Sequence, residues 1–184
     1  MPADIAPDTE FFEAMFQSIA ADLAMIMDTS IAVDGLACER ANKRAAGEGQ
    51  VHISFKFLVH HEGVERQGSV LVPLPDAIAL ASYLMMMAPE EIEEQRQNPD
   101  LDRPLKEAML EVGNFVSGAI DAVIRTWYPS DASCRSLGCQ GVRADVRPAF
   151  DYGEGDELAV ASAAISVEDF EPFRMVVQMP PPAA

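Results

Sequence analysis

Four residues in the second half of the chain have the types and spacing that chemistry on a bound group would need. They follow one another at intervals of four, three and four residues, which on an α-helix places them on one face. They are Glu107, Glu111, Asn114 and Gly118. Carboxylates accept hydrogen bonds, and a carboxamide accepts one and donates another. The competing interpretation is a solvated helix face, on which glutamate is common.

The helix that carries this face is predicted from about Pro104 to Trp127. Proline suits the first turn of a helix, and Pro129 ends this one by restricting Tyr128. The apolar residues of the opposite side, which would pack inward, are Met109, Val112, Val116, Ile120 and Val123. Gly113 and Gly118 each cost about 1 kcal/mol relative to alanine inside a helix. We therefore expect a packed element or a docking partner to approach the backbone closely there.

The rest of the chain alternates between helix and strand signals. Further helices are predicted at 8–28, with Asp8 or Thr9 as the N-cap, and at 77–87, opened by Pro75 and Asp76. Strands are predicted at 29–36, 51–61, 67–74, 142–149, 158–167 and 173–179. Polar stretches predicted as loops or linkers are 38–50, 89–103 and 131–141, with room for a short helical turn in 89–103.

The order of these elements repeats, because each long helix is followed by three strands. Residues 12–16, FEAMF, also resemble residues 106–110, KEAML, at an offset of 94. We therefore predict an α+β fold in one domain, residues 1–184, built from two pseudo-symmetric helix-plus-three-strand halves. The halves span about 8–74 and 104–179 and together form a six-stranded sheet with the long helices packed on it. Helix 76–88 and an acidic linker join them.

Composition and charge exclude several classes of protein. A formal net charge of −17 would be repelled by nucleic acid and by an anionic membrane surface. No apolar run approaches the ~20 residues that cross a bilayer, and the N-terminal residues lack a signal-peptide pattern. Three cysteines without zinc-site spacing predict free thiols and no metal. We therefore predict a cytoplasmic protein.

The run EVGNFVSGA at residues 111–119 resembles the active-site signature of the CheC, CheX and FliY chemotaxis phosphatases. In that family a glutamate, and an asparagine three residues later, project from a long helix. The approach resembles CheX: a strand at 68–74, a methionine-rich helix opened by Pro-Asp, an acidic stretch, and then the signature helix. The resemblance covers about 67–124 well and the rest by the order of elements.

The resemblance implies a CheC-like fold and a phosphatase acting on the aspartyl phosphate of a CheY-like response-regulator receiver domain. Asn114 would orient the attacking water, and Glu111 would pair with the lysine beside the partner's phosphorylation site. Glu107 and Gly118 would belong to the docking surface. The chain would need no cofactor of its own, because Mg²⁺ belongs to the receiver domain.

Two positions depart from the family pattern. The family has serine or aspartate where Glu107 stands, and a proline about 22 residues after the asparagine, where Ser136 stands. If the stretch 131–141 is an inserted loop, it displaces that proline to Pro148, and the site is intact; if it is not, binding without catalysis stays open as an alternative.

The sequence also predicts how many sites each chain carries and whether the chains form an oligomer. At the offset of 94, Gln17 and Ala20 take the places of Glu111 and Asn114, so one site per chain is expected, as in CheX. The strand at 173–179, taken as a sheet edge with one charged residue, and the dimeric state of CheX predict a homodimer. The competing prediction is a monomer protected by its proline tail, 180–182.

Two alternatives to the phosphatase stay open. One is a non-catalytic CheC-like module that docks a receiver domain or another chemotaxis protein, and the other is a structural part of a flagellar switch. Asn114 favours the phosphatase, because a docking surface has no need of a water-orienting amide. A serine hydrolase lacks its G-x-S-x-G context, and a nucleotide enzyme lacks its glycine-rich loop.

Overall fold

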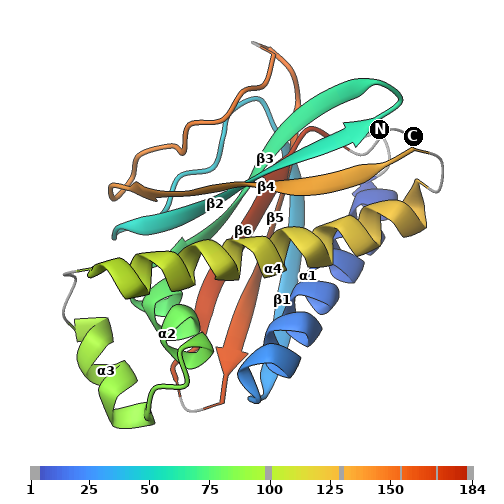
Figure 1. The fold of residues 1–184 in the computed structure, drawn as a ribbon. Coiled ribbons are helices and arrows are strands. Elements are labelled where there is room, and N and C mark those ends of the chain that lie inside the picture. Colours follow the sequence, from blue (N-terminus) through green and yellow to red (C-terminus); the bar gives the residue numbers. More distant parts are fainter. Residues whose placement is uncertain (1–4, 98–100, 129–130, 154, 169, 182–184) are drawn as a thin grey trace.

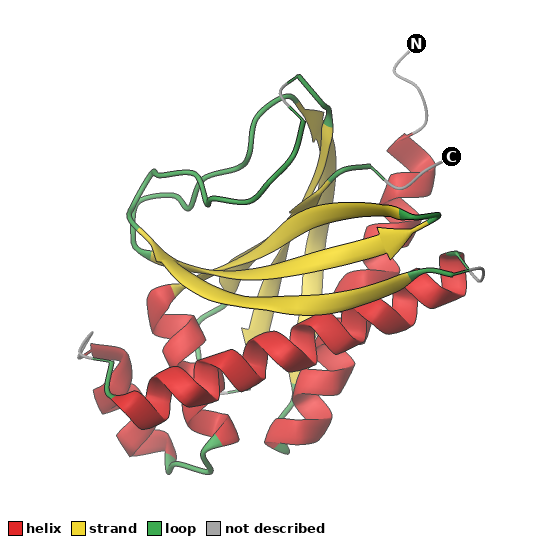
Figure 2. Ribbon diagram, turned by 45° about the horizontal axis from the view of Figure 1, so that its top comes forward, coloured by secondary structure: helices red, strands yellow, loops and turns green. Residues whose placement is uncertain are grey.

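The computed structural model describes residues 5–97, 101–128, 131–153, 155–168 and 170–181. Its helices are α1 (Ile5–Met27), α2 (Leu74–Leu84), α3 (Pro89–Gln97) and α4 (Arg103–Trp127). Its strands are β1 (Ile31–Ala41), β2 (His52–His61), β3 (Val64–Pro73), β4 (Ser133–Val142), β5 (Leu158–Val167) and β6 (Phe173–Met179). The strands form one antiparallel sheet, with the helices gathered on one face (Figures 1 and 2). The predicted α+β class and six-stranded sheet are confirmed.

The strand order is β1-β5-β6-β3-β2-β4. If β1 is exchanged with β4, β2 with β5 and β3 with β6, the same order is obtained, read from the opposite edge of the sheet. Each half contributes a hairpin, β2–β3 or β5–β6, to one side of the sheet and its first strand to the other side. The centre is the pairing of β3 with β6, with Val70 opposite Val177 in the middle of three paired positions. The pseudo-symmetric arrangement therefore interleaves the two halves in one continuous sheet.

Both edge strands are bulged at corresponding places. The pairing of β1 with β5 shifts register between Asp34 and Ala37, and Gly35 there has a φ of +63°. The pairing of β4 with β2 shifts beside Lys56, where Gly138 has a φ of +90°. A glycine in the left-handed region is the usual device for inserting one extra residue into an antiparallel ladder.

The main hydrophobic core lies between the helices and the sheet. From α1 it takes Phe11, Phe12 and Phe16, all 1% exposed or less. The edge of the Phe11 ring meets the ring of Trp127, with centroids 5.4 Å apart, so the start of α1 packs against the end of α4. A smaller cluster on the opposite face of the sheet is Leu71, Phe150, Leu158, Val160 and Val176.

The burial patterns of α1 and α4 coincide at a spacing of 97 residues, not 94. At 97, buried Phe12 corresponds to buried Met109, whereas at 94 it would correspond to exposed Lys106. The sequence match between residues 12–16 and 106–110 is thus out of phase with the packing of the two helices. In the phase that packing sets, Ala14 and Gln17 take the places of Glu111 and Asn114, so α1 still lacks the pair.

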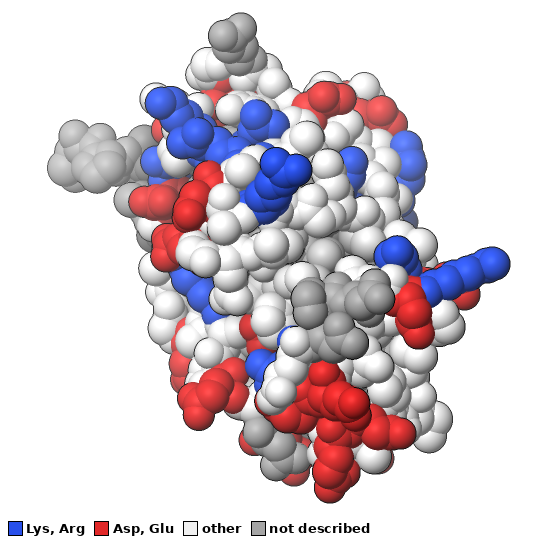
Figure 3. All heavy atoms as spheres, turned by 90° about the vertical axis from the view of Figure 1, so that its left-hand side faces the viewer, with Lys and Arg blue, Asp and Glu red and all other residues white. Residues whose placement is uncertain are grey.

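Charge is spread unevenly over the surface, as Figure 3 shows for one face. The acidic side chains at one end include those of α3, whose exposed glutamates are Glu90, Glu91, Glu93 and Glu94. Exposed basic residues of the loops after β1 and β4 include Lys43, Arg143 and Arg147. The net negative charge is therefore partly concentrated on α3, away from the middle of α4.

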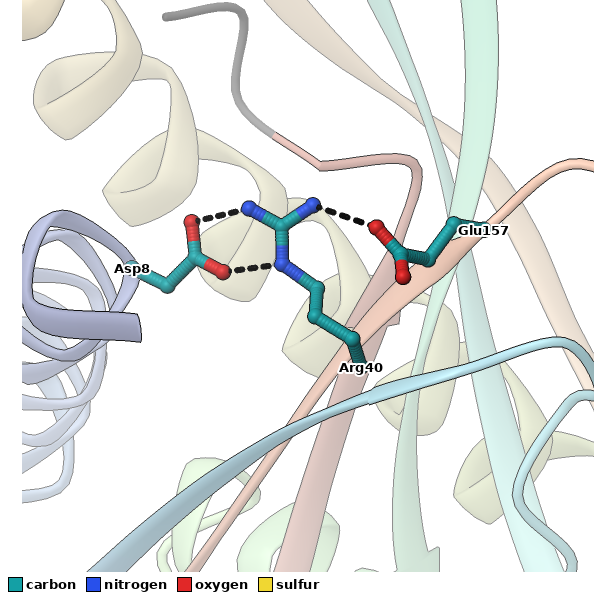
Figure 4. A network of polar contacts seen from close by, with 3 residues as sticks. All are labelled: Asp8, Arg40 and Glu157. Carbon is teal, nitrogen blue, oxygen red and sulfur yellow. Dashed lines mark hydrogen bonds and ion pairs between the residues drawn. The ribbon is translucent and has the colours of Figure 1, made fainter. Parts of the chain in front are cut away.

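An ion-pair network ties the start of α1 to the sheet (Figure 4). Asp8 is buried, and its carboxylate accepts two hydrogen bonds from the Arg40 guanidinium, the Nη2 bond being 2.8 Å long. Arg40 also donates to Glu157 at 3.1 Å. Because α1 begins at Ile5, Asp8 is not the N-cap that the sequence predicted; its carboxylate instead fixes the helix to β1.

Three other predictions about elements were wrong. The stretch predicted as a linker with room for a short helical turn contains a nine-residue helix, α3, which is held by fully buried Ile92. The stretch 131–141, predicted as a loop, forms most of β4, while 143–149 is not a strand. The strand predicted at the sheet edge is β6, which lies inside the sheet between β5 and β3. Within the part of the chain described, no helix is long and apolar enough to cross a membrane.

Candidate functional site

Helix α4 is a rigid support for the predicted face. Asp102 caps it, its carboxylate accepting a hydrogen bond from the Leu105 backbone N–H at 2.9 Å. One side of the helix is buried against the sheet and α1, where the hydroxyl of Ser18 donates to the Ala119 carbonyl at 3.1 Å. The four predicted residues all lie on the exposed side, as their spacing required: Glu107, Glu111, Asn114 and Gly118.

Glu111 and Asn114 contact each other. The Asn114 amide nitrogen Nδ2 donates to Glu111 Oε2 at 3.3 Å. Among the residues that the structure describes, no other hydrogen bond is made by this amide, so its carbonyl oxygen Oδ1 is open to solvent. This oxygen can accept a hydrogen bond from a water molecule while Glu111 holds the orientation of the amide.

Glu107 and Gly118 lie one turn to either side of this pair. Glu107 accepts a hydrogen bond from Arg103 at 2.7 Å in an exposed i, i+4 ion pair, a kind of contact that contributes little to stability. A Cβ added at Gly118 would meet nothing within 4 Å. Nothing within the described chain therefore explains the glycine, whereas a docking partner would.

Gly113 has an internal explanation. A Cβ there would lie 3.1 Å from Cδ1 of Phe55 on β2 and 3.9 Å from Oγ of Ser136 on β4. The predicted close approach of a packed element thus exists at Gly113. It also places Ser136 beside the backbone of α4, one residue from Asn114, on a strand and not in an inserted loop. The displacement of a family proline to Pro148 therefore has no structural basis.

A hollow lies beside the pair, where α4 crosses β4, and is called here the α4–β4 hollow. Its volume is about 320 Å³, and its lining is Ile53, Leu101, Lys106, Met109, Leu110, Cys139 and Gly141. Leu110 is 44% exposed at its rim. The sequence did not predict this hollow, although Leu110 was out of phase with the buried side of the helix and could have marked it.

The cysteines offer neither a nucleophile nor a metal site. All three are free thiols. Burial, with a smaller contribution from Asp121, raises the pKa of Cys134 to about 12, and burial raises the pKa of Cys139. Both therefore stay protonated at neutral pH, which suppresses their reactivity. No group of three or more metal-binding side chains occurs among the described residues.

A larger hollow, about 530 Å³, lies beside α3 and not at this face. Arg96 lines both this hollow and a second one, donating to Asp76 at 3.0 Å and stacking over the Phe170 ring at 4.5 Å. Burial raises the pKa of Asp76 to about 6, although Arg96 opposes the shift. These contacts join α3 to α2 and do not reach Asn114.

No protein-family model matches the sequence, and no curated protein matches it either. Solved structures do match. Thermotoga maritima FliY is 17% identical with a TM-score of 0.71, covering 97% of this chain and 90% of its own. Vibrio vulnificus CheX is 10% identical with a TM-score of 0.59, covering 92% and 97%. The FliM middle domain from H. pylori is 10% identical with a TM-score of 0.62, covering 94% and 88%.

The fold is thus that of CheX, FliY and the middle domain of FliM, and it extends over nearly the whole chain. At these identities the likeness is one of fold, and what the protein does has to be argued from its own residues.

Proposed function

We propose that this protein is a phosphatase for the aspartyl phosphate of a CheY-like receiver domain. The observation that carries the proposal is the exposed contact between Asn114 and Glu111, presented by a capped helix in a fold shared with CheX and FliY. An amide fixed by a neighbouring carboxylate on a convex helix cannot enclose a small substrate. It can, however, be inserted into the phosphorylation site of another protein.

The chemistry asked of this pair is positioning. An aspartyl phosphate is an activated acyl phosphate, and its hydrolysis needs a water in line with the bond from phosphorus to the leaving carboxylate oxygen. Asn114 Oδ1 would accept a hydrogen bond from that water and hold it on line, as the water oxygen bonds to phosphorus and the aspartate leaves as carboxylate. Mg²⁺ on the receiver domain would supply charge neutralisation for the phosphoryl oxygens.

Glu111 would have two tasks. Its carboxylate orients the Asn114 amide across 3.3 Å in the free protein. On docking, the same carboxylate would pair with a lysine at the receiver's phosphorylation site, a contact that favours the correct register. Glu107 and Gly118, one turn away on each side, would lie within the docked surface.

A second candidate, a docking module without catalysis, is favoured by one observation. FliM has the same fold, and it has been solved in a FliG–FliM complex and in a FliM–SpeE complex. The departures at Glu107 and Ser136 also agree with this alternative. Where the docked partner is a receiver domain, the two candidates differ in whether that receiver loses its phosphate faster; the second candidate also covers docking to another chemotaxis protein.

The test is to phosphorylate a panel of receiver domains with a small-molecule phosphodonor in Mg²⁺ and time phosphate loss with and without the protein. We expect at least one receiver domain to lose phosphate faster by a factor of about a hundred or more, since a positioned water lowers the barrier by kilocalories. Binding to a receiver domain without any acceleration would establish the docking module instead.

A further inference from the structure

The α4–β4 hollow is almost wholly apolar, although it opens beside the polar pair Glu111 and Asn114. Its lining carries a single charged group, the ammonium of Lys106, at the margin. Leu110 at the rim is 44% exposed, and Leu101 is half-buried. Single exposed leucines are ordinary, but an apolar hollow with an exposed rim is a place where another molecule can bury apolar surface.

The position of the hollow links it to the Glu111–Asn114 pair. Leu110 precedes Asn114 by one helical turn, about 6 Å along the axis, and Lys106 precedes it by about 12 Å. A stable protein–protein interface covers about 800 Å² on each partner. A receiver domain that brings its phosphorylation site to Asn114 therefore also covers the hollow.

The chemistry of the lining selects the occupant. A polar metabolite needs several convergent hydrogen-bonding groups to fix its orientation, and the lining side chains provide only Lys106 for that purpose. An aliphatic or aromatic side chain needs none, since its burial is favourable in any orientation that fits.

We propose that the α4–β4 hollow receives an apolar side chain of the docked receiver domain and sets docking affinity, an inference that rests on the proposed function. The catalytic pair and the hollow then divide the work. Asn114 acts on the phosphoryl group, and the hollow anchors the partner in the way that a central apolar pocket anchors other interfaces.

Two substitutions on different elements remove the hollow's apolar character. Leu110→Gln keeps helix propensity and net charge. Gly141→Asp adds a carboxylate to the lining of the hollow, at a position where an added Cβ meets nothing within 4 Å and therefore does not clash. The matched control is Met25→Gln, on α1 and 74% exposed.

The experiment uses the receiver domain whose phosphate loss the wild-type protein accelerates most. Initial rates across a range of phosphorylated receiver give kcat and KM, and titration with the same receiver activated by beryllofluoride in Mg²⁺ gives Kd. Both hollow variants should raise KM and Kd about tenfold or more, with kcat within twofold of wild type, as loss of one buried apolar contact predicts. Met25→Gln should match wild type.

An active wild type with unchanged KM and Kd in both hollow variants would overturn the hollow's role and leave the proposed function standing. If one variant fails to fold by circular dichroism, the other decides. A wild type that neither binds nor dephosphorylates any receiver domain would overturn the proposed function and, with it, this inference.

Discussion

At the scale of residues, the two members of the pair on α4 have different roles in the proposed function, Asn114 acting on the water and Glu111 orienting the amide. The carbonyl oxygen of Asn114 accepts no hydrogen bond from the described residues, and Glu111 accepts from its amide at 3.3 Å. The spacing of these residues was enough to predict their shared exposed face. Their contact with each other could also have been predicted, because side chains three residues apart on a helix are neighbours.

Glu111→Gln should weaken docking more than it slows chemistry. The substitution keeps the length of the side chain and a hydrogen-bond acceptor for Asn114, but it removes the charge that would meet the receiver's lysine. We expect KM for the phosphorylated receiver domain to rise about tenfold while kcat falls less than threefold. An unchanged KM, measured alongside wild type, would contradict the assigned role.

The two glycines of α4 should respond differently to alanine. Gly118→Ala places a methyl group in open space and should raise the free energy of unfolding by about 0.5–1 kcal/mol. Gly113→Ala forces a methyl group to 3.1 Å from the buried Phe55 ring, so it should be less stable than Gly118→Ala by about 1 kcal/mol or more. Urea unfolding compares them, and equal stabilities would contradict the packing described.

At the scale of elements, the sequence was informative where apolar periodicity was strong and misleading where it was weak. Helix α4 and the β2–β3 hairpin were predicted from their patterns. Helix α3 has one buried apolar residue, Ile92, and its position is set by tertiary contacts such as that of Ile92 and that of Arg96 with Asp76 and the Phe170 ring. Strand β4 is a bulged edge strand with a half-buried, polar sequence, so no alternation marked it. The hollow was not predicted, because β4, which forms one wall of it, was predicted as a loop; the out-of-phase Leu110 was the one signal in the sequence that pointed to it.

Asp76 makes the joint between α2 and α3 sensitive to pH. Burial raises the pKa of its carboxyl to about 6, from an ordinary value near 4 in the unfolded chain. As the pH falls from about 7 to 4, the folded protein takes up this proton first. The ionised carboxyl therefore costs up to about 3 kcal/mol of stability above about pH 6, and this cost disappears as the pH falls from about 6 to about 4.

Asp76→Asn should remove this dependence. We expect the variant to gain stability relative to wild type at pH 7.5 and to lose that advantage at pH 4.5. Arg96 keeps Glu93 at 3.6 Å and the Phe170 ring as neighbours in the variant. Urea unfolding at the two pH values measures the change, and parallel behaviour of variant and wild type would show that this carboxyl is not the titrating group.

At the scale of the whole molecule, the interleaved halves decide which strands can meet another chain. The homodimer predicted from the sequence relied on β6 as an open edge, but β6 lies inside the sheet. The edges are β1 and β4, and each carries a glycine bulge and charged residues, features that discourage edge pairing. We therefore expect light scattering at micromolar concentration to give the mass of one chain, 20.0 kDa. A mass of twice that value would instead support the homodimer predicted from the sequence.

The pseudo-symmetry also supplies a control for the central claim. In the phase set by packing, Gln17 on α1 occupies the place of Asn114 on α4, and both are exposed carboxamides. Ala14 stands where Glu111 would be, so α1 lacks the orienting carboxylate. Gln17→Ala therefore tests whether an exposed amide on a long helix contributes to dephosphorylation without an orienting carboxylate beside it.

The most direct measurement is the single-turnover rate of phosphate loss from a receiver domain saturated with wild type, Asn114→Ala or Gln17→Ala. Loss of the positioned water in Asn114→Ala should slow the stimulated rate about a hundredfold, near 2.7 kcal/mol of barrier, with beryllofluoride-receiver affinity within threefold of wild type. Gln17→Ala should keep the wild-type rate. A folded Asn114→Ala variant that dephosphorylates as fast as wild type would contradict the account.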